Sequence, residues 1–181
     1  YETVVRRSSA IDLGHANDLA YNPTTNKIYV ATGSTGTNAN KIARLDGTTL
    51  ALETTMDLGN SRPKWLCAYD AINDRYYVLD TDYLTVYDSE WSQLKQYSNT
   101  YADDYAGPAD MTAQSSFCYD GNFIALYFCR EIVSSSQSIS GIYFQMIDYE
   151  TGEVKTVAQY SPRGNADEPE FVALIGDVGY M

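Results

Sequence analysis

The chain has 181 residues, with 24 acidic and 12 basic side chains and a formal charge of −12. Nucleic acids and anionic membrane surfaces are bound through clustered basic residues, so this charge argues against both as partners. The sequence contains no apolar run of about 18 residues and therefore predicts no membrane insertion.

Three segments repeat one pattern: a short apolar strand, a polar turn and a second strand. They span residues 17–30, 65–78 and 116–126, and their turns hold Asn22-Pro23, Asn73-Asp74 and Asp120-Gly121. Such residues favour tight turns for steric reasons, so each segment predicts a β-hairpin. The equivalent tyrosines of the three repeats are Tyr21, Tyr69 and Tyr119.

The second half of each unit repeats as well. An alternating strand ends at an aspartate, and a short turn leads into another strand; the equivalent acids are Asp46, Asp88 and Asp148. An Asp side chain accepts hydrogen bonds from the N–H groups of a turn, so we expect a structural role for all three. Each unit thus has four strands in roughly 45 to 55 residues, which is typical of a propeller blade.

The sequence therefore predicts an all-β fold, a β-propeller of four-stranded antiparallel blades, with about three complete blades and two partial ones. We expect one domain over residues 1–181, with blade ends near 14, 59–64, 98–114 and 161–168. A β-sandwich is the alternative, but it does not explain the four-strand period.

The two partial blades lie at the ends of the sequence. Residues 12–14 match residues 57–59, which predicts that the segment up to Gly14 is the last strand of another blade. A fourth copy of the repeat opens at residues 170–174 and turns at Gly176-Asp177. Because a third strand for a blade shared by both ends is missing, we expect a longer propeller, or a partner protein that completes it.

In a propeller, the loops that join consecutive blades open onto one face near the central channel, and function collects on such loops. The corresponding segments are 14–18, 60–65, 99–114 and 162–168. Their aromatic, amide and charged groups suit a polyhydroxylated or zwitterionic ligand. The candidate ligand-binding residues are His15, Asn17, Asp18, Arg62, Lys64, Trp65, Tyr105 and Arg163. For each of them, packing or solvation is the alternative role.

Asp103, Asp104 and Asp110 offer oxygen ligands for a hard cation and form a candidate calcium site, although their spacing is not that of an EF-hand. We expect no other cofactor. The three cysteines, Cys67, Cys118 and Cys129, lie in apolar runs without a metal-binding spacing. A single disulfide between two of them is an alternative to three free thiols.

No motif for a nucleophile, a zinc ion or a phosphate is present. A hydrolase or lactonase remains an alternative, since Asp103, Asp104, Asp110 and Glu168 provide carboxyl groups in the predicted loops. A protein-interaction scaffold is a second alternative.

The segment Gly14-His15-Ala16-Asn17-Asp18, with residues 19–31 after it, resembles propeller domains of Gram-positive bacteria and their phages. This group includes helveticin-like bacteriocins, a teichoic-acid-biosynthesis-type propeller and phage tail receptor-binding propellers. The resemblance implies a non-catalytic module that binds an envelope carbohydrate or glycopolymer, outside the cell or on a virion. It also implies that His15, Asn17 and Asp18 lie at the channel mouth. The later loops lack the histidine.

Overall fold

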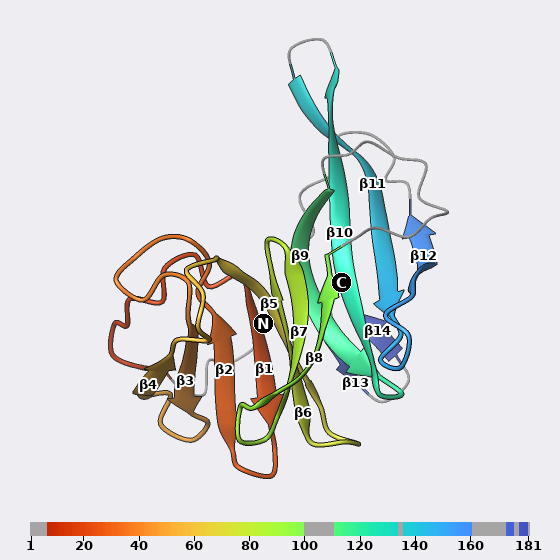
Figure 1. Cartoon of the computed structure of the whole chain (residues 1–181). Coiled ribbons are helices and arrows are strands. Elements are labelled where there is room, and N and C mark those ends of the chain that lie inside the picture. Colours follow the sequence, from red (N-terminus) through yellow and green to blue (C-terminus); the bar gives the residue numbers. More distant parts are fainter. Residues whose placement is uncertain (1–6, 100–110, 134–135, 161–172, 176–177, 181) are drawn as a thin grey trace.

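The computed structural model describes residues 7–99, 111–133, 136–160, 173–175 and 178–180. Across these ranges the regular structure is entirely β, with three four-stranded antiparallel sheets, one hairpin and no helix (Figure 1). Consequently, no described segment forms a helix that could cross a membrane. The predicted all-β fold is confirmed.

Each sheet is one predicted blade, in which every strand pairs with its neighbour in the chain. Blade 1 comprises β1 (Asp18–Asn22), β2 (Lys27–Ala31), β3 (Ile42–Asp46) and β4 (Leu52–Met56). Blade 2 comprises β5 (Lys64–Asp70), β6 (Arg75–Asp80), β7 (Tyr83–Asp88) and β8 (Gln93–Ser98). Blade 3 comprises β9 (Met111–Tyr119), β10 (Asn122–Val133), β11 (Ser136–Ile147) and β12 (Val154–Tyr160). The hairpin of β13 (Ala173–Ile175) and β14 (Val178–Tyr180) follows.

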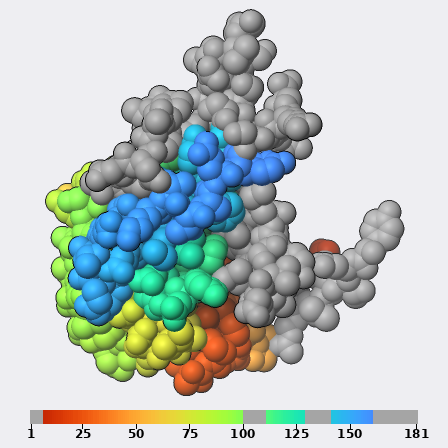
Figure 2. Space-filling model, turned by 90° about the vertical axis from the view of Figure 1, so that its right-hand side faces the viewer, coloured from red at the N-terminus to blue at the C-terminus, as the bar shows by residue number. Residues whose placement is uncertain are grey.

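The hydrophobic core lies between the blades, which pack face to face in chain order. At the surface, their segments follow one another from red and orange through yellow and green to blue (Figure 2). Between blades 1 and 2, Tyr29 meets the ring of Tyr76 edge-on, with centroids 4.7 Å apart. Between blades 2 and 3, Tyr77 stacks on Phe123 at 5.6 Å. Tyr29 and Tyr77 hold equivalent places in their second strands, so the same face of each blade covers the blade that follows.

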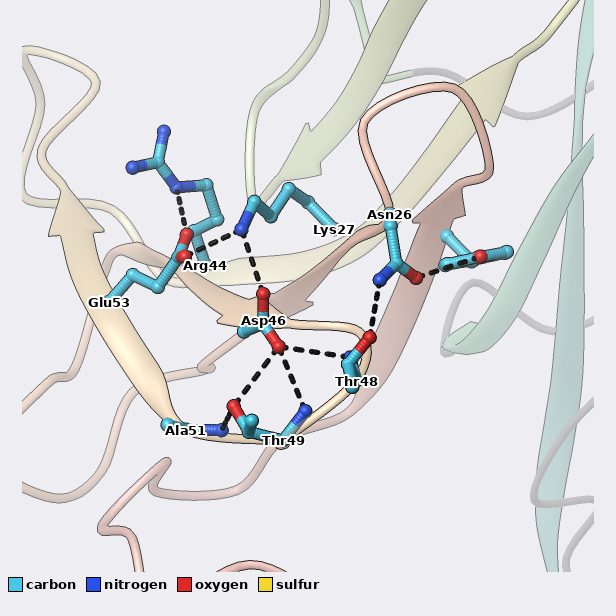
Figure 3. Close-up of polar contacts among 9 residues, drawn as sticks. Asn26, Lys27, Arg44, Asp46, Thr48, Thr49, Ala51 and Glu53 are labelled. Atoms are coloured by element: carbon cyan, nitrogen blue, oxygen red, sulfur yellow. Dashed lines mark hydrogen bonds and ion pairs between the residues drawn. The ribbon is translucent and has the colours of Figure 1, made fainter.

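The aspartates at the ends of the third strands support the turns, as the sequence predicts. In blade 1, Asp46 accepts hydrogen bonds from two N–H groups of the next turn, at 3.0 and 2.8 Å (Figure 3). Lys27 bridges Asp46 and Glu53 at 3.0 and 2.6 Å. These bonds lower the pKa of Asp46. Asp88 and Asp148 accept the same kind of turn N–H bonds, which confirms the structural role of all three.

The third repeat is shifted relative to the predicted match between Tyr69 and Tyr119. Cys118 pairs with Phe123, which pairs with Ile147, the residue before Asp148. In blade 2, Tyr69 pairs with Tyr76, which pairs with Tyr87, the residue before Asp88. Cys118 therefore takes the place of Tyr69. Tyr119 takes the place of Asp70, the last residue of β5, and is 56 % exposed. The thiols of Cys67 and Cys118 are free.

The expected strand before Gly14 is not formed in the described part of that segment. Residues 7–13 lie outside every sheet. A strand requires a partner strand for its N–H and C=O groups, and this segment has none beside it. Instead, Ile11 and Leu13 pack against Val30, Ala43 and Leu45, on the face of blade 1 that is turned away from blade 2.

Strands β10 and β11 form a hairpin that extends beyond the rest of blade 3 (Figure 1). Pairing of β10 with β9 stops at Cys129, but β10 and β11 continue to pair as far as Val133 and Ser136. Ser136 and Ser138 both belong to β11. Blade 3 therefore differs from the others in the length of its central strands.

Candidate functional site

The three innermost strands, β1, β5 and β9, contact one another where each of them begins. Asn17 precedes β1, and its Nδ2 donates to the carbonyl oxygens of Trp65 in β5 and Ala113 in β9, both at 3.2 Å. A backbone hydrogen bond from Asn17 N–H to Ala31, at 3.1 Å, holds the same residue to blade 1. The predicted ligand residue Asn17 thus joins all three blades.

Asp18 lies in the interior beside this junction. One carboxylate oxygen accepts hydrogen bonds from Ser116 Oγ at 2.6 Å and Cys67 N–H at 3.1 Å, and the other accepts from Ser115 Oγ at 3.2 Å. Burial raises the pKa of Asp18 to about 7, although these hydrogen bonds oppose the rise. No described ion pair includes it. We expected Asp18 at the channel mouth, and the structure places its side chain in the protein interior, among the innermost strands.

A cavity of about 470 Å³ opens at the beginnings of the innermost strands. Its polar lining comes from His15, Asn17, Thr81, Asn99, Thr112 and Gln114, and its apolar lining from Trp65, Leu79, Met111, Ala113 and Tyr127. Three predicted ligand residues, His15, Asn17 and Trp65, therefore meet in one cavity. They come from the first two predicted loops. Met111 to Gln114, which we expected in the third loop, form the beginning of strand β9.

His15 and Trp65 both lie next to Gly33. A Cβ atom built on Gly33 would stand 2.9 Å from His15 Cβ and 3.5 Å from Trp65 Cζ3. The backbone of Gly33 has a φ of +64°, and its N–H donates to the Lys64 carbonyl at 2.9 Å. Trp65 Nε1–H donates to Thr81 Oγ1 at 3.3 Å. The wall of the cavity thus depends on a glycine that permits both the backbone conformation and the close approach.

The two basic candidates within the described residues do not line the cavity. Lys64 is only 1 % exposed, and its Nζ donates to Asn60 Oδ1 and to the Arg62 carbonyl, each at 2.6 Å. Burial lowers the pKa of this ammonium group. Arg62 forms an ion pair with Asp82 at 2.6 Å and lies over the ring of Tyr83, 5.1 Å from its centroid. Neither side chain lines the cavity.

The remaining candidates, Tyr105, Arg163, Asp103, Asp104, Asp110 and Glu168, lie outside the described residues. Within the described ranges, no group of three His, Cys, Asp or Glu side chains is placed to hold a metal ion. The calcium site stays a prediction.

Sequence reasoning missed two features of the cavity wall. Thr81 lies in the turn between β6 and β7, whereas we considered only the loops between blades. Asn99 begins the predicted third loop, but its residue type alone did not distinguish it from its neighbours. Asn99 Nδ2 donates to the Thr81 carbonyl at 3.3 Å, which holds the two residues together at the rim.

No protein-family model matches the sequence, and no protein of curated function is significantly similar to it. A crystal structure of a nidogen/laminin complex superposes with a TM-score of 0.52 at 12 % identity, over 86 % of this chain and 51 % of that chain. Sqt1 of Saccharomyces cerevisiae and hydrazine synthase of Kuenenia stuttgartiensis each give a TM-score of 0.45, at 8 % and 12 % identity. They are matched over 83 % and 89 % of this chain and over 36 % and 53 % of theirs.

The chain therefore spans about half or less of the length of these structures. The first of these matches, together with the three four-stranded sheets, identifies the fold as that of a β-propeller. At this level of identity the likeness concerns the fold alone.

Proposed function

We propose that the protein is a non-catalytic recognition module that binds an uncharged carbohydrate in the cavity between His15 and Trp65. The observation that carries this proposal is the cavity itself, about 470 Å³ in volume, at the point where three blades converge. Rigid sheets hold its walls, and its size falls within the range of small-molecule sites, roughly 300 to 1,000 Å³.

The chemistry of the lining favours a neutral, polyhydroxylated ligand. Thr81, Asn99 and Thr112 supply hydroxyl and amide groups, and the indole of Trp65 supplies an aromatic surface for the apolar side of a sugar ring. Among the described residues that line the cavity there is no Asp, Glu, Lys or Arg. Among these described residues, a phosphate or ammonium group would find no Asp, Glu, Lys or Arg as a counter-charge.

The same absence of acids from the described lining favours binding over hydrolysis. A glycosidase requires two carboxyl groups on either side of the scissile bond. Three described acids adjoin lining residues in the chain, namely Asp18, Asp80 and Asp82. The oxygens of Asp18 are bonded to Ser115, Ser116 and the N–H of Cys67. Asp80 accepts the N–H groups of Asp82 and Tyr83, and Asp82 forms an ion pair with Arg62. A hydrolase would need its acids from another part of the chain.

The biological source of the ligand is inferred from the resemblance of residues 14–31 to propellers that act on bacterial envelopes. This resemblance is the basis for the proposed target. It supports a glycan of the cell envelope as the target, with the protein outside the cell or on a virion. The net charge of −12 favours a neutral glycan over a polyanionic glycopolymer.

The test is a glycan-array screen of the intact protein, with and without calcium, followed by affinity measurements on His15→Ala and Thr112→Ala. We expect each variant to weaken binding about tenfold, since each removes a hydrogen-bonding group from the cavity. Ile72→Ala and Tyr119→Ala change exposed residues outside the cavity and serve as controls. A blank array, or a glycan bound equally by all four variants, would overturn the proposal and favour a protein-interaction scaffold.

A further inference from the structure

The cavity between His15 and Trp65 borders the hydrophobic core. Leu79, Met111 and Tyr127 are buried, belong to the core between blades 2 and 3, and line the cavity. We call these three side chains the apolar wall. A ligand that carries a small apolar group would bury that group here, because contact with the wall removes it from water. A plain hexose has no methyl group to place against such a wall.

Asn99 lines the same cavity and contains a buried oxygen atom that has no hydrogen-bond donor among the described residues. Its Nδ2 donates to the Thr81 carbonyl at 3.3 Å, which leaves Oδ1 as the unpaired end of the amide. Buried polar groups in folded proteins are nearly always paired, since an unpaired acceptor loses its hydrogen bonds to water and gains none in return. An N–H or O–H group of a ligand would pair with this oxygen.

Thr81 holds the amide of Asn99 and the indole of Trp65 together. Its hydroxyl oxygen accepts a hydrogen bond from Trp65 Nε1–H at 3.3 Å, and its carbonyl oxygen accepts the bond from Asn99. The aromatic surface that suits the apolar face of a sugar ring is therefore fixed relative to the unpaired amide oxygen. A sugar unit with a hydrogen-bond donor on a short substituent would meet both.

We infer that this cavity binds a 2-acetamido sugar, with the acetyl methyl group on the apolar wall and the amide N–H on Asn99 Oδ1. This assignment rests on the proposed function, because it takes the ligand to be a neutral carbohydrate. An acetamido group joins a methyl group and an N–H donor in one planar unit, which matches the two features of the cavity that a plain hexose does not use together. Thr112, at the same cavity, offers a hydroxyl donor for the acetyl oxygen.

Three other kinds of sugar match only part of this chemistry. A 6-deoxy sugar and an O-acetyl sugar each supply a methyl group but lack the N–H donor for Asn99. A 2-amino sugar without the acetyl group lacks the methyl group, and its charged form finds no Asp or Glu among the described lining residues. The acetamido sugar is the one of the four that satisfies both the apolar wall and the amide oxygen.

The test compares matched pairs of sugars on the intact wild-type protein by isothermal titration calorimetry. The pairs are the methyl glycosides of glucose and N-acetylglucosamine, of galactose and N-acetylgalactosamine, and of mannose and N-acetylmannosamine, so that only the group at C2 differs within a pair. In the pair with the right ring configuration, we expect the acetamido sugar to bind at least about tenfold more tightly, since it buries a methyl group and pairs a buried acceptor. The N-glycolyl analogue, which adds a hydroxyl to the methyl group, should lose most of this gain, because the hydroxyl would be buried against the apolar wall.

Asn99→Ala tests the amide contact, with Ser98→Ala at the exposed neighbouring position as the matched control. We expect Asn99→Ala to lower the preference for the acetamido sugar over its parent sugar at least about threefold, because the acceptor for the N–H group is lost. Ser98→Ala should leave this preference unchanged. The comparison of sugars uses the wild type and therefore stays decisive even if Asn99→Ala does not fold.

Equal affinities within every pair, with binding still measurable, would overturn the acetamido assignment and leave the carbohydrate-binding function standing. Tighter binding of a methyl 6-deoxyhexoside than of any acetamido sugar would overturn it in favour of a methyl group without an N–H donor. An unchanged preference in Asn99→Ala would overturn the contact assigned to Asn99. If no sugar binds, the acetamido assignment and the proposed function fail together.

Discussion

Asp18 in the first strand of blade 1 accepts a 2.6 Å hydrogen bond from Ser116 in the first strand of blade 3. The same carboxylate oxygen accepts the N–H of Cys67 in blade 2. One acid therefore touches three sheets, and it does so while buried. Burial disfavours its charged form, which gives the stability of the protein a dependence on pH.

The first prediction concerns Asp18→Asn. The pKa of Asp18 rises from an ordinary 3.8 to about 7, so the folded state holds its proton more tightly than the unfolded state. Its contribution to stability is complete below about pH 4 and is lost as the pH rises through about 7, by roughly 4 kcal/mol at most. Asparagine stays neutral throughout. We expect the free energy of unfolding of the wild type, relative to the variant, to fall across this window.

Urea denaturation of both proteins at several pH values measures this difference. Taking the difference between the two proteins cancels the titration of the other acids, such as Asp46 and Asp148, whose lowered pKa values act in the opposite direction. Asp74→Asn, at an exposed turn, is the control substitution. A constant difference between wild type and Asp18→Asn would contradict the prediction.

The second prediction compares two glycines with positive φ. Gly59 has a φ of +80°, and no atom lies within 4 Å of the position that a Cβ atom would take. Gly59→Ala should therefore lower the free energy of unfolding only through the strain of the left-handed backbone, by about 1 to 2 kcal/mol. Gly33→Ala adds a contact of 2.9 Å with His15 Cβ. We expect a larger loss of stability for Gly33→Ala, together with weaker glycan binding as His15 is displaced. Equal losses in urea denaturation would show that the wall between His15 and Trp65 can relax.

The third prediction concerns Arg75, which joins blades 2 and 3. Its guanidinium bonds Asp70 at 2.8 Å and the Gly121 carbonyl at 2.7 Å, and lies 3.4 Å from the ring centroid of Tyr149. Arg75→Met leaves the buried carboxylate of Asp70 without its cation, and we expect a loss of about 3 to 5 kcal/mol.

Two further variants sharpen this experiment. Arg75→Lys keeps the charge but not the planar fork, so its stability should lie between those of the wild type and Arg75→Met. Lys27→Met removes a surface cation that bridges Asp46 and Glu53, and should cost much less, because exposed ion pairs are well solvated. Denaturant midpoints compare all of them. Similar losses for Arg75→Met and Lys27→Met would contradict the role assigned to Arg75.

The features that the sequence predicted well are local ones. Turn residues and alternating strands depend on near neighbours, so the hairpins and the turn role of Asp46 followed from the repeat alone. The equivalence of Tyr119 failed because the turn after β9, residues 120–121, is shorter than the turn after β5, residues 71–74. Tyr119 therefore stands at the place of Asp70, although Tyr119-Asp120 matches Tyr69-Asp70 in sequence. The strand expected before Gly14 failed because a strand exists only beside a partner.

The candidate site shows the same division. His15 and Trp65 could be placed in one region because the repeat locates the loops between blades. Lys64 could not be recognised as buried, since its burial depends on Asn60 and a carbonyl oxygen folding back onto its ammonium group. Thr81 was missed because it lies in a turn within blade 2, and only the folded structure brings this turn next to the loops between blades that line the cavity.

The bonds of Asn17 and Asp18 also distinguish this protein from linear repeat arrays. In such arrays each repeat touches only its neighbours, so a weakened repeat can fray while the others persist. Here two adjacent residues of blade 1 bond directly to blade 3 as well as to blade 2. Damage to any one blade removes hydrogen bonds from the other two. We therefore expect the three sheets to unfold together, in a single cooperative transition.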